Sequence, residues 1–417
     1  MIRTIAPLLL GIGILIMGNG LAGIILPIKM SNLLYSEQIS GLVMAFYYVG
    51  FAFGARLAQR IIGNLGHVRA FAALSALVSA AVLSYGLLPG MITWALLRCL
   101  NGFAMAVLFA IVESWLSERS ANHNRGRILS LYMVTSYFAS GSGQLLVNIY
   151  DTTGVELFAL AGLILVIALV PVILTKNPSP DIQEITPLSF RQLYQLSPLG
   201  IIGVIGAGLL SGGFYGMGAI FAAQAGFITL EKSLFLFAAI LGGLLIQWPV
   251  GKLSDRYDRR HVILWISLSI VLITGFAFIW GTLGNYSFYF VAFIALLFGG
   301  AAATLYPLSL AHAFTYVEKR SLVSANSGLL LGWALGASVG PVIVGLLMRL
   351  TGQKGFFLYA AFISLSLACF VKYRMGRRKS KPISEQAVFM PLPENALETG
   401  NLDPRTNNDK NEDKLKQ

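Results

Sequence analysis

The chain has 417 residues, of which 56% are hydrophobic and only 12% are charged. Water-soluble proteins carry about 25% charged residues, so this composition leaves too little polar surface for a soluble fold of this size. The two cysteines and four histidines are scattered, which argues against a disulfide framework and against a metal site. In a soluble protein, the net charge of +12 would favour nucleic acid as a partner. In a membrane protein, the distribution of basic residues between the loops must first be examined as an indicator of membrane topology.

Twelve stretches are long and apolar enough to cross a bilayer, which takes roughly 20 residues per helix. We expect helices, because backbone groups in hydrocarbon must be bonded internally and the period-2 alternation of a membrane barrel is absent. The first stretch is too long for the apolar region of a signal peptide, so we expect it to be retained. The predicted spans are residues 5–28, 39–57, 69–88, 91–114, 128–150, 155–175, 198–225, 232–250, 262–281, 285–312, 321–348 and 355–372.

The basic residues near these spans lie mostly on one side of the predicted membrane. If the N-terminus is inside, the loops and tail on the inner side hold most of the lysines and arginines. The outer loops hold only four, which are Lys29, Lys232, Arg349 and Lys354. The positive-inside rule then places both termini in the cytoplasm. The net charge is explained by topology, and no nucleic-acid partner is predicted.

The spans divide the chain into two similar halves. We predict an N-terminal six-helix bundle over residues 1–175, a polar cytoplasmic linker over 176–197 and a C-terminal six-helix bundle over 198–374. Residues 375–417 are polar and poor in aromatics, so we expect a disordered cytoplasmic tail. The basic stretch at its beginning, residues 372–381, is suited either to anionic lipid headgroups or to a simple stop-transfer anchor.

An internal repeat with an offset near 197 residues supports this division. The loop after the second span, residues 54–60, reads Gly-Ala-Arg-Leu-Ala-Gln-Arg, and the loop after the eighth begins Gly251-Lys-Leu-Ser-Asp255-Arg256. Two six-helix blocks with a duplicated loop are typical of two-bundle secondary transporters.

These residues resemble the major facilitator superfamily. Residues 251–260 match that family's G-x-L-x-D-R-x-x-R-R loop signature. Arg98 to Gly102 resembles its R-x-x-q-G signature, with Asn101 in place of glutamine, and residues 336–341 resemble its glycine–proline helix motif. The resemblance covers about residues 5–374. It implies an all-α fold of 12 transmembrane helices in two pseudo-symmetric bundles, alternating access and proton coupling.

Two further segments resemble one branch of this family, and two positions differ from the family's motifs. Glu113-Ser-Trp-Leu and Leu305-Tyr-Pro-Leu are similar to a bacterial branch of YcaD-like transporters. The first-half loop has alanine at position 58 where the second half has Asp255, so the paired gate is expected to be asymmetric. The proline-containing motif of drug antiporters is also missing at residues 141–144.

Arg98 is the strongest candidate for a functional charge inside the membrane. It lies about seven residues into the fourth span, or roughly 10 Å from the outer end. Charges at such depth are costly and mark functional sites. Arg98 either lines a cavity, where it binds a substrate anion or tunes a proton site, or reaches back to anchor the helix at the interface. The resemblance favours the cavity, since the family's arginine in this span faces it.

Glu113 lies on the same helix but about 22 Å further along, close to the inner surface. We expect an inner-gate ion pair with Arg60, Arg69 or Arg127. The alternatives are a proton-carrying carboxylate, with a pKa raised by partial burial, or a plain helix-end residue.

The loop signature predicts a second gating element. Gly251 permits close helix approach, while Asp255, followed by Arg256, can pair with a cation or a helix N-terminus during each cycle. The alternative is topology and helix capping. His312 falls near the repeat equivalent of Glu113 and is either a helix-end cap or a proton relay.

Polar and aromatic residues near the middle of the spans are candidates for the cavity wall, although each could instead bridge two helices. Together with Arg98 they are Asn19, Asn101, Tyr137, Gln144, Tyr215, Asn326 and Trp333.

The sequence therefore predicts a monomeric secondary transporter that moves a small organic solute, which Arg98 suggests is anionic. Protons are the expected coupling ion and membrane lipid the expected surroundings. The alternative is a solute sensor with a transporter fold and no net transport. No catalytic cluster, cofactor or metal is expected, and no nucleotide-binding G-x-x-x-x-G-K-[ST] sequence is present.

Overall fold

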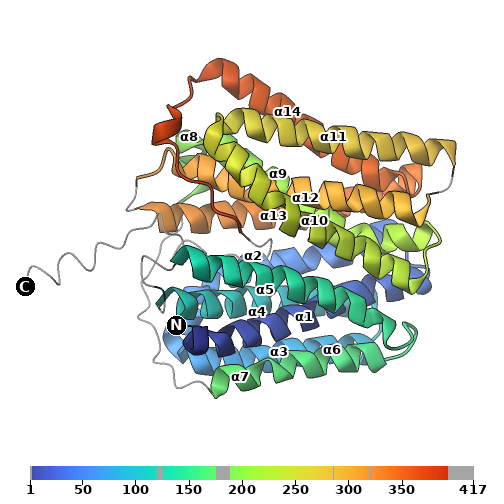
Figure 1. Ribbon diagram of the computed structural model, residues 1–417. Helices are drawn as coiled ribbons and strands as arrows, with labels where there is room; N and C mark the ends of the chain where they lie inside the picture. Colours follow the sequence, from blue (N-terminus) through green and yellow to red (C-terminus); the bar gives the residue numbers. More distant parts are fainter. Residues whose placement is uncertain are drawn as a thin grey trace, which may run out of the picture.

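The computed structural model describes residues 2–118, 120, 125–174, 188–284, 286–318 and 321–392, and nearly all of them are helical (Figure 1). The first half contains α1 (Ile2–Asn32), α2 (Glu37–Leu65), α3 (His67–Leu87), α4 (Met91–Glu118), α5 (Arg125–Leu145), α6 (Glu156–Ile167) and α7 (Leu169–Ile173). The second contains α8 (Phe190–Leu196), α9 (Pro198–Gln224), α10 (Thr229–Arg256), α11 (Arg259–Leu283), α12 (Phe288–Phe314), α13 (Leu322–Thr351) and α14 (Gly355–Arg377).

The helix boundaries follow local chemistry. The Ser36 hydroxyl accepts a hydrogen bond from the N–H of Ile39 and caps α2. Ser197 caps α9 in the same way, with Pro198 at the first helical position. Between α2 and α3 a single residue, Gly66, turns the chain with φ +76°, a conformation that favours glycine.

The twelve predicted spans correspond to the long helices. Eleven helical segments of the described chain are long and apolar enough to cross a membrane, and one of them combines α6 with α7. These two are separate because Pro171 lacks an N–H and its ring clashes with the carbonyl of Ile167, which interrupts the helix. The remaining predicted span is α5, which is 21 residues long but less apolar because it carries Arg125 and Arg127 and several serines and glycines.

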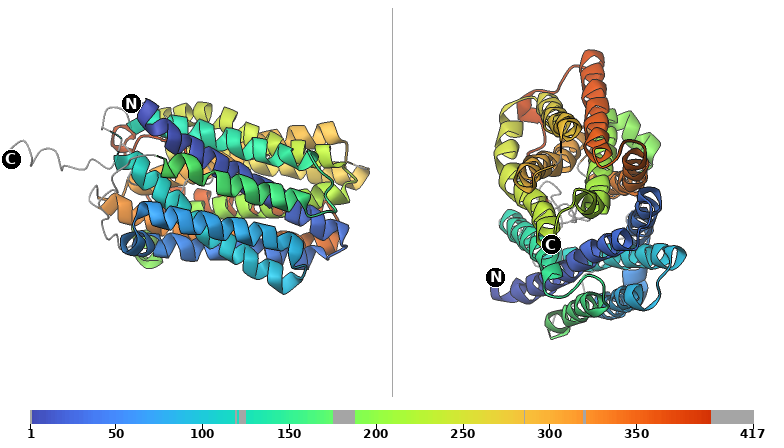
Figure 2. Two further views of the ribbon diagram at one scale, coloured as in Figure 1. Left: turned by 90° about the horizontal axis from the view of Figure 1, so that it is seen from below. Right: turned by 90° about the vertical axis from the view of Figure 1, so that its right-hand side faces the viewer.

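The helices form two bundles that lie side by side, α1–α7 in one and α9–α14 in the other (Figures 1 and 2). The first helix begins and the last helix ends at the same end of the molecule. We call this end, with Ile2 and Arg377, the terminal face, and the opposite end the distal face. This all-helical, two-bundle architecture confirms the predicted fold class.

Glycines set how closely the helices pack, and the same crossing occurs in both halves. A Cβ atom on Gly50 or Gly102 would overlap a backbone carbonyl across the α2–α4 contact. Gly242 and Gly299 make the equivalent approach between α10 and α12. Small residues let helix backbones meet this closely in a membrane, where packing rather than hydrophobic burial holds helices together.

The bundles are joined at the distal face. A Cβ on Gly41 would overlap the Pro341 carbonyl, and a Cβ on Gly345 would overlap that of Glu37. The Asn148 Nδ2 atom donates a hydrogen bond of 2.9 Å to the hydroxyl of Ser233 in the other bundle. Direct backbone contact between α2 and α13 therefore closes the distal side of the bundle interface.

The segments outside the bundles differ from the sequence prediction. Of the predicted linker, residues 176–187 lie outside the described residues, and the rest forms the short helix α8, which Ser189 caps. The predicted tail begins at 375, but α14 continues to Arg377. Residues 378–392 are not disordered: the chain passes back toward the other bundle (Figure 1), with Phe389 and Leu392 buried. Residues 393–417 lie outside the described part.

Candidate functional site

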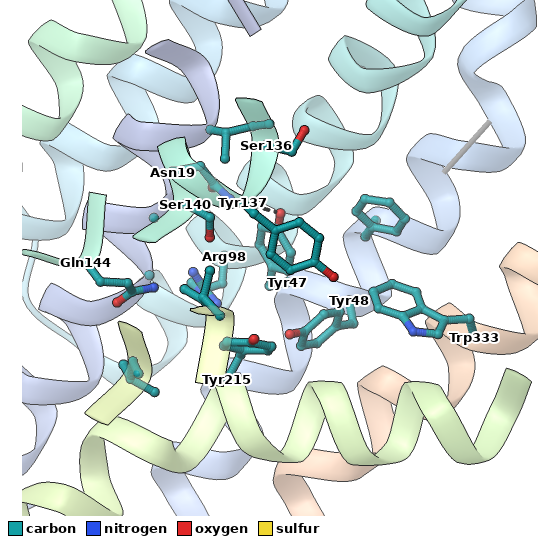
Figure 3. A pocket seen from close by; sticks show the side chains of 16 residues that line it. Asn19, Tyr47, Tyr48, Arg98, Ser136, Tyr137, Ser140, Gln144, Tyr215 and Trp333 are labelled. Atoms are coloured by element: carbon teal, nitrogen blue, oxygen red, sulfur yellow. Dashed lines mark hydrogen bonds between the residues drawn. The ribbon is translucent and has the colours of Figure 1, made fainter. Parts of the chain in front are cut away.

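A cavity of about 100 Å³ lies between the two bundles (Figure 3). One water needs about 10–15 Å³ on this scale, so the cavity has room for several waters or a small organic molecule. Its wall combines helices of both bundles. The lining residues are Ile16, Asn19, Gly20, Gly23, Tyr47, Tyr48, Phe51, Arg98, Ser136, Tyr137, Ser140, Gln144, Tyr215, Leu236, Ile240 and Trp333.

Among the described residues of this wall, Arg98 is the only one with a formally charged side chain. It is 5% exposed, and its guanidinium carbon lies 4.7 Å from the centre of the Tyr47 ring, a cation–π contact. Its Nε atom has no hydrogen-bond partner within the described chain. Because the described part of the wall contains no carboxylate, the cavity presents an uncompensated positive charge.

Aromatic rings from both bundles form one side of the cavity. The ring of Trp333 on α13 lies 5.9 Å from that of Tyr48 and 6.0 Å from that of Phe51, both on α2, in edge-to-face geometry. Tyr47 and Tyr48 are 5.2 Å apart, also edge to face. These contacts give the cavity a flat apolar surface next to the charge of Arg98.

Two amides in the wall retain hydrogen-bonding capacity. The Asn19 Nδ2 atom donates to the Tyr47 hydroxyl at 3.3 Å, while its Oδ1 atom has no partner in the part of the chain that the structure describes. The Oε1 atom of Gln144 is likewise buried without a partner there. Since buried polar atoms are normally bonded, these oxygens are suited to a bound solute or water.

The structure brings together six of the eight residues that the sequence predicted for the cavity. They are Asn19, Arg98, Tyr137, Gln144, Tyr215 and Trp333. Asn101 and Asn326 do not line it. Asn101 is fully buried three residues beyond Arg98, and Asn326 is buried about two helical turns before Trp333, toward the terminal face. Polarity within a span does not show which way each helix faces.

Sequence reasoning missed the contribution of α2. Three aromatic residues within this apolar span were not singled out from the sequence. All three line the cavity, and they are Tyr47, Tyr48 and Phe51. Tyr47 and Phe51 are four residues apart and therefore share a helix face. A pair of aromatics at this spacing is the signal that could have indicated them.

Glu113 lies outside the cavity wall and is 1% exposed. Its carboxylate accepts a hydrogen bond of 3.0 Å from the Tyr132 hydroxyl on α5. The predicted partners Arg60, Arg69 and Arg127 are exposed, and no ion pair joins them to Glu113 among the described residues. The expected gate pair with one of these three arginines is therefore not formed in this conformation of the described chain, because Glu113 is buried while the three arginines are exposed.

The loop signature makes its contacts within its own half of the chain. The Asp255 side chain is 43% exposed and lies 3.7 Å from Arg259, while Arg256 is exposed. Asp258 caps α11 and pairs with Arg260 at 2.7 Å. Burial raises the pKa of Asp258, but its hydrogen bonds with Arg260 outweigh this effect and hold the pKa below the ordinary value.

His312 and Gly251 occupy separate places at the terminal end of the second bundle. His312 is buried, with its ring 5.3 Å from that of Tyr316, and lines a small recess with Arg260 and Arg378. Gly251 faces the ring of Phe389, where a Cβ would overlap the ring. Neither residue reaches the cavity.

Comparison with known proteins identifies the family to which the chain belongs. The family model described as the major facilitator superfamily matches residues 8–230 and 200–397. An uncharacterised transporter of this type from Enterobacter sp. (strain 638) is 27% identical over 91% of this chain and 96% of its own length. YcaD of Salmonella arizonae is 27% identical over 87% of this chain and 93% of its own. These relatives are named as transporters, not enzymes, and they confirm the resemblance to the YcaD-like branch.

Solved structures agree on the fold. A mutant of the nucleoside transporter NupG matches with a TM-score of 0.73 at 13% identity, over 89% of this chain and 99% of that one. A bacterial homologue of the lysosomal transporter Spinster, in an inward-facing, occupied conformation, matches with a TM-score of 0.67 at 13% identity, over 92% and 98%. With a family match that covers most of its length and a cavity between two helical bundles, this chain belongs to the major facilitator superfamily of transporters.

Proposed function

We propose that this chain moves a small organic anion across the bacterial cytoplasmic membrane. The observation that carries the proposal is Arg98, a buried cation in a wall whose described residues include no carboxylate. An uncompensated buried charge is costly, and an anionic solute would offset that cost while it is bound. A guanidinium also presents paired donors that match the oxygens of a carboxylate or phosphate.

The rest of the wall indicates an organic solute with a flat apolar part. The rings of Tyr48, Phe51 and Trp333 offer stacking surfaces, and the free oxygens of Asn19 and Gln144 can accept hydrogen bonds from the solute. We infer a planar or aromatic anion that carries at least one donor group. All these residues belong to one chain, which supports a monomer as the transporting unit.

Alternating access fits the contacts between the bundles. The distal side of their interface is closed by backbone contact at Gly41 and Gly345. We infer that the two units, residues 1–175 and 198–374, rock about the cavity and open these contacts in the other half of the cycle. The exposed arginines of the terminal face, which include Arg60, Arg69, Arg127 and Arg256, favour a cytoplasmic position for that face.

Glu113 is our candidate for proton coupling. It is a buried carboxylate, and the Tyr132 hydroxyl that bonds it connects α4 with α5. When this carboxylate gains or loses a proton, its hydrogen bond to Tyr132 changes, and with it the interaction between α4 and α5. Both helices also carry residues of the cavity wall. His312 is the second candidate, because it too is a buried titratable group near the terminal face.

The proposal is tested by solute counterflow in proteoliposomes, with aromatic carboxylates and their uncharged amides as paired probes. We expect exchange of a carboxylate and none of its amide, and loss of that exchange in Arg98→Gln but not in the surface variant Arg377→Gln. Exchange of both members of a pair would refute the role of Arg98. Binding that shifts the melting temperature without any exchange would instead indicate a sensor.

A further inference from the structure

The chain's own C-terminal segment packs against α10, between the part of this helix that lines the cavity and its end at the terminal face. After α14 the chain forms a short 3-10 turn (Ile383–Glu385) and then continues without regular secondary structure to residue 392. Figure 1 shows this red segment leaving the second bundle and passing toward the first. We call residues 387–392 the return segment.

One face of α10 holds the return segment. The Phe389 N–H donates a hydrogen bond of 3.0 Å to Asp255 Oδ1, the Phe389 ring fills the space beside Gly251, and Gln247 Nε2 donates a bond of 2.9 Å to the Leu392 carbonyl. Asp255, Gly251 and Gln247 are spaced by four residues and therefore lie along one side of the helix. Gln247 and Asp255 are separated by a helical rise of about 12 Å. The three residues from Phe389 to Leu392 can reach about 10 Å, so the hydrogen bonds at both ends require the segment to run along α10.

Other contacts fix the start of the return segment. The Ala387 carbonyl accepts a hydrogen bond of 2.6 Å from Arg259, and the Ala387 N–H donates one of 3.2 Å to the Thr315 hydroxyl. These partners lie at the start of α11 and just after α12. The bond from Arg259 is charge-assisted, as is the one that Asp255 accepts, which makes both stronger than bonds between neutral groups.

The segment reaches the wall of the cavity. Leu392 is 2% exposed, and Gln247, which bonds its carbonyl, also lies 3.4 Å from the hydroxyl of Tyr137 on the other bundle. Tyr137 lines the cavity, as does Ile240, two helical turns further along α10 toward the distal face. A solute that leaves the cavity along this side of α10 toward the terminal face would meet Leu392 first and Phe389 next.

We propose that the return segment is a plug that closes the terminal-face route to the cavity and must detach for a solute to pass. The inference rests on the proposed function in taking the cavity as a solute path. Its chemistry suits a reversible contact: the segment is held by two apolar side chains and a few hydrogen bonds, without a covalent link. In this chain, two residues of the loop signature then form part of the α10 surface that binds the plug. They are Asp255 and Gly251.

Cysteine accessibility tests the plug without measuring transport. The probe is Ser140→Cys in the cavity wall, in full-length protein with Cys99→Ser and Cys369→Ser, treated in detergent with a charged maleimide. We expect slow labelling in this parent and labelling about tenfold faster in Phe389→Ala and Leu392→Ala, because each loses a buried apolar anchor.

Two controls make the result specific. Ile383→Ala changes an apolar residue of the same region that is half exposed, so it should leave the labelling rate unchanged. A cysteine at Thr282, on the exposed distal end of α11, should react equally in all variants. If Phe389→Ala does not fold, Leu392→Ala alone carries the test.

An unchanged labelling rate in the anchor variants, or an equal increase in Ile383→Ala, would overturn the plug. Faster labelling in the anchor variants supports it even if no solute is exchanged. Failure of the plug and failure of the proposed transport are therefore distinguishable.

Discussion

Gly102→Ala is the substitution whose effect the structure predicts most sharply. A Cβ at position 102 would overlap the carbonyl group of Tyr47 on α2, which is backbone and cannot rotate away. The two helices must separate, and Tyr47 moves with its helix. We therefore expect two linked effects, a loss of stability and a displaced ring beside Arg98.

The magnitude follows from the packing. Overpacking a tight contact costs about 1–3 kcal/mol, and the upper part of this range, about 2–3 kcal/mol, applies here because the overlapped group is rigid backbone. Alanine offsets about 1 kcal/mol of this cost through its better helix propensity. At about 3 °C per kcal/mol for a bundle of this size, a net loss of 1–2 kcal/mol lowers the melting temperature by about 3–6 °C.

The assay is thermal unfolding of the purified protein in detergent, followed by intrinsic fluorescence. Gly275→Ala is the matched control, because Gly275 is also helical but no neighbouring atom of the described chain lies within 4 Å of the position that a Cβ would take there. This control should unfold at the same temperature as the parent or higher. Equal melting temperatures for Gly102→Ala and Gly275→Ala would refute the close crossing of α2 and α4.

Three further predictions test separate parts of the molecule. Glu113→Gln should impair proton-driven uptake while counterflow at equal pH persists; unchanged uptake in proteoliposomes would remove this carboxylate from coupling. Trp333→Ala should weaken binding of an aromatic anion by about tenfold, since an aromatic contact is worth about 0.5–1.5 kcal/mol beyond its buried area; calorimetric titration checks this. Asp258→Asn keeps a helix cap but loses the charge that pairs with Arg260. Because the pKa of Asp258 is depressed in the folded state, its stabilisation is present above about pH 4, the unfolded value, and is lost as pH falls through the folded pKa. The melting temperatures of parent and Asp258→Asn should therefore differ at pH 7 and converge in acid.

The loop signature makes a contact in the structure that could not be predicted from its residue types. The pattern predicts that Asp255 and Gly251 act between the two bundles. In the structure they bind the chain's own return segment, 134 residues further along in the case of the Asp255–Phe389 hydrogen bond. Glu113 shows the converse: its position near a helix end predicts only partial burial, and its bond with Tyr132 depends on how α4 and α5 pack.

Composition, hydropathy and the repeated loop by themselves predicted a membrane protein with twelve spans in two related halves. That information is local, because any stretch of about 20 apolar residues must span as a helix whatever surrounds it. The same reasoning singled out Arg98, since a charge is costly at that depth in any fold. Only the tertiary structure decided that Gln144 lines the cavity and Asn101 does not, because the rotation of each helix is set by side chains it meets from distant parts of the chain. The return segment was decided in the same way: its apolar run is only six residues long within a polar tail, so the sequence predicts disorder, and it is ordered by partners on α10 and α11 more than a hundred residues earlier.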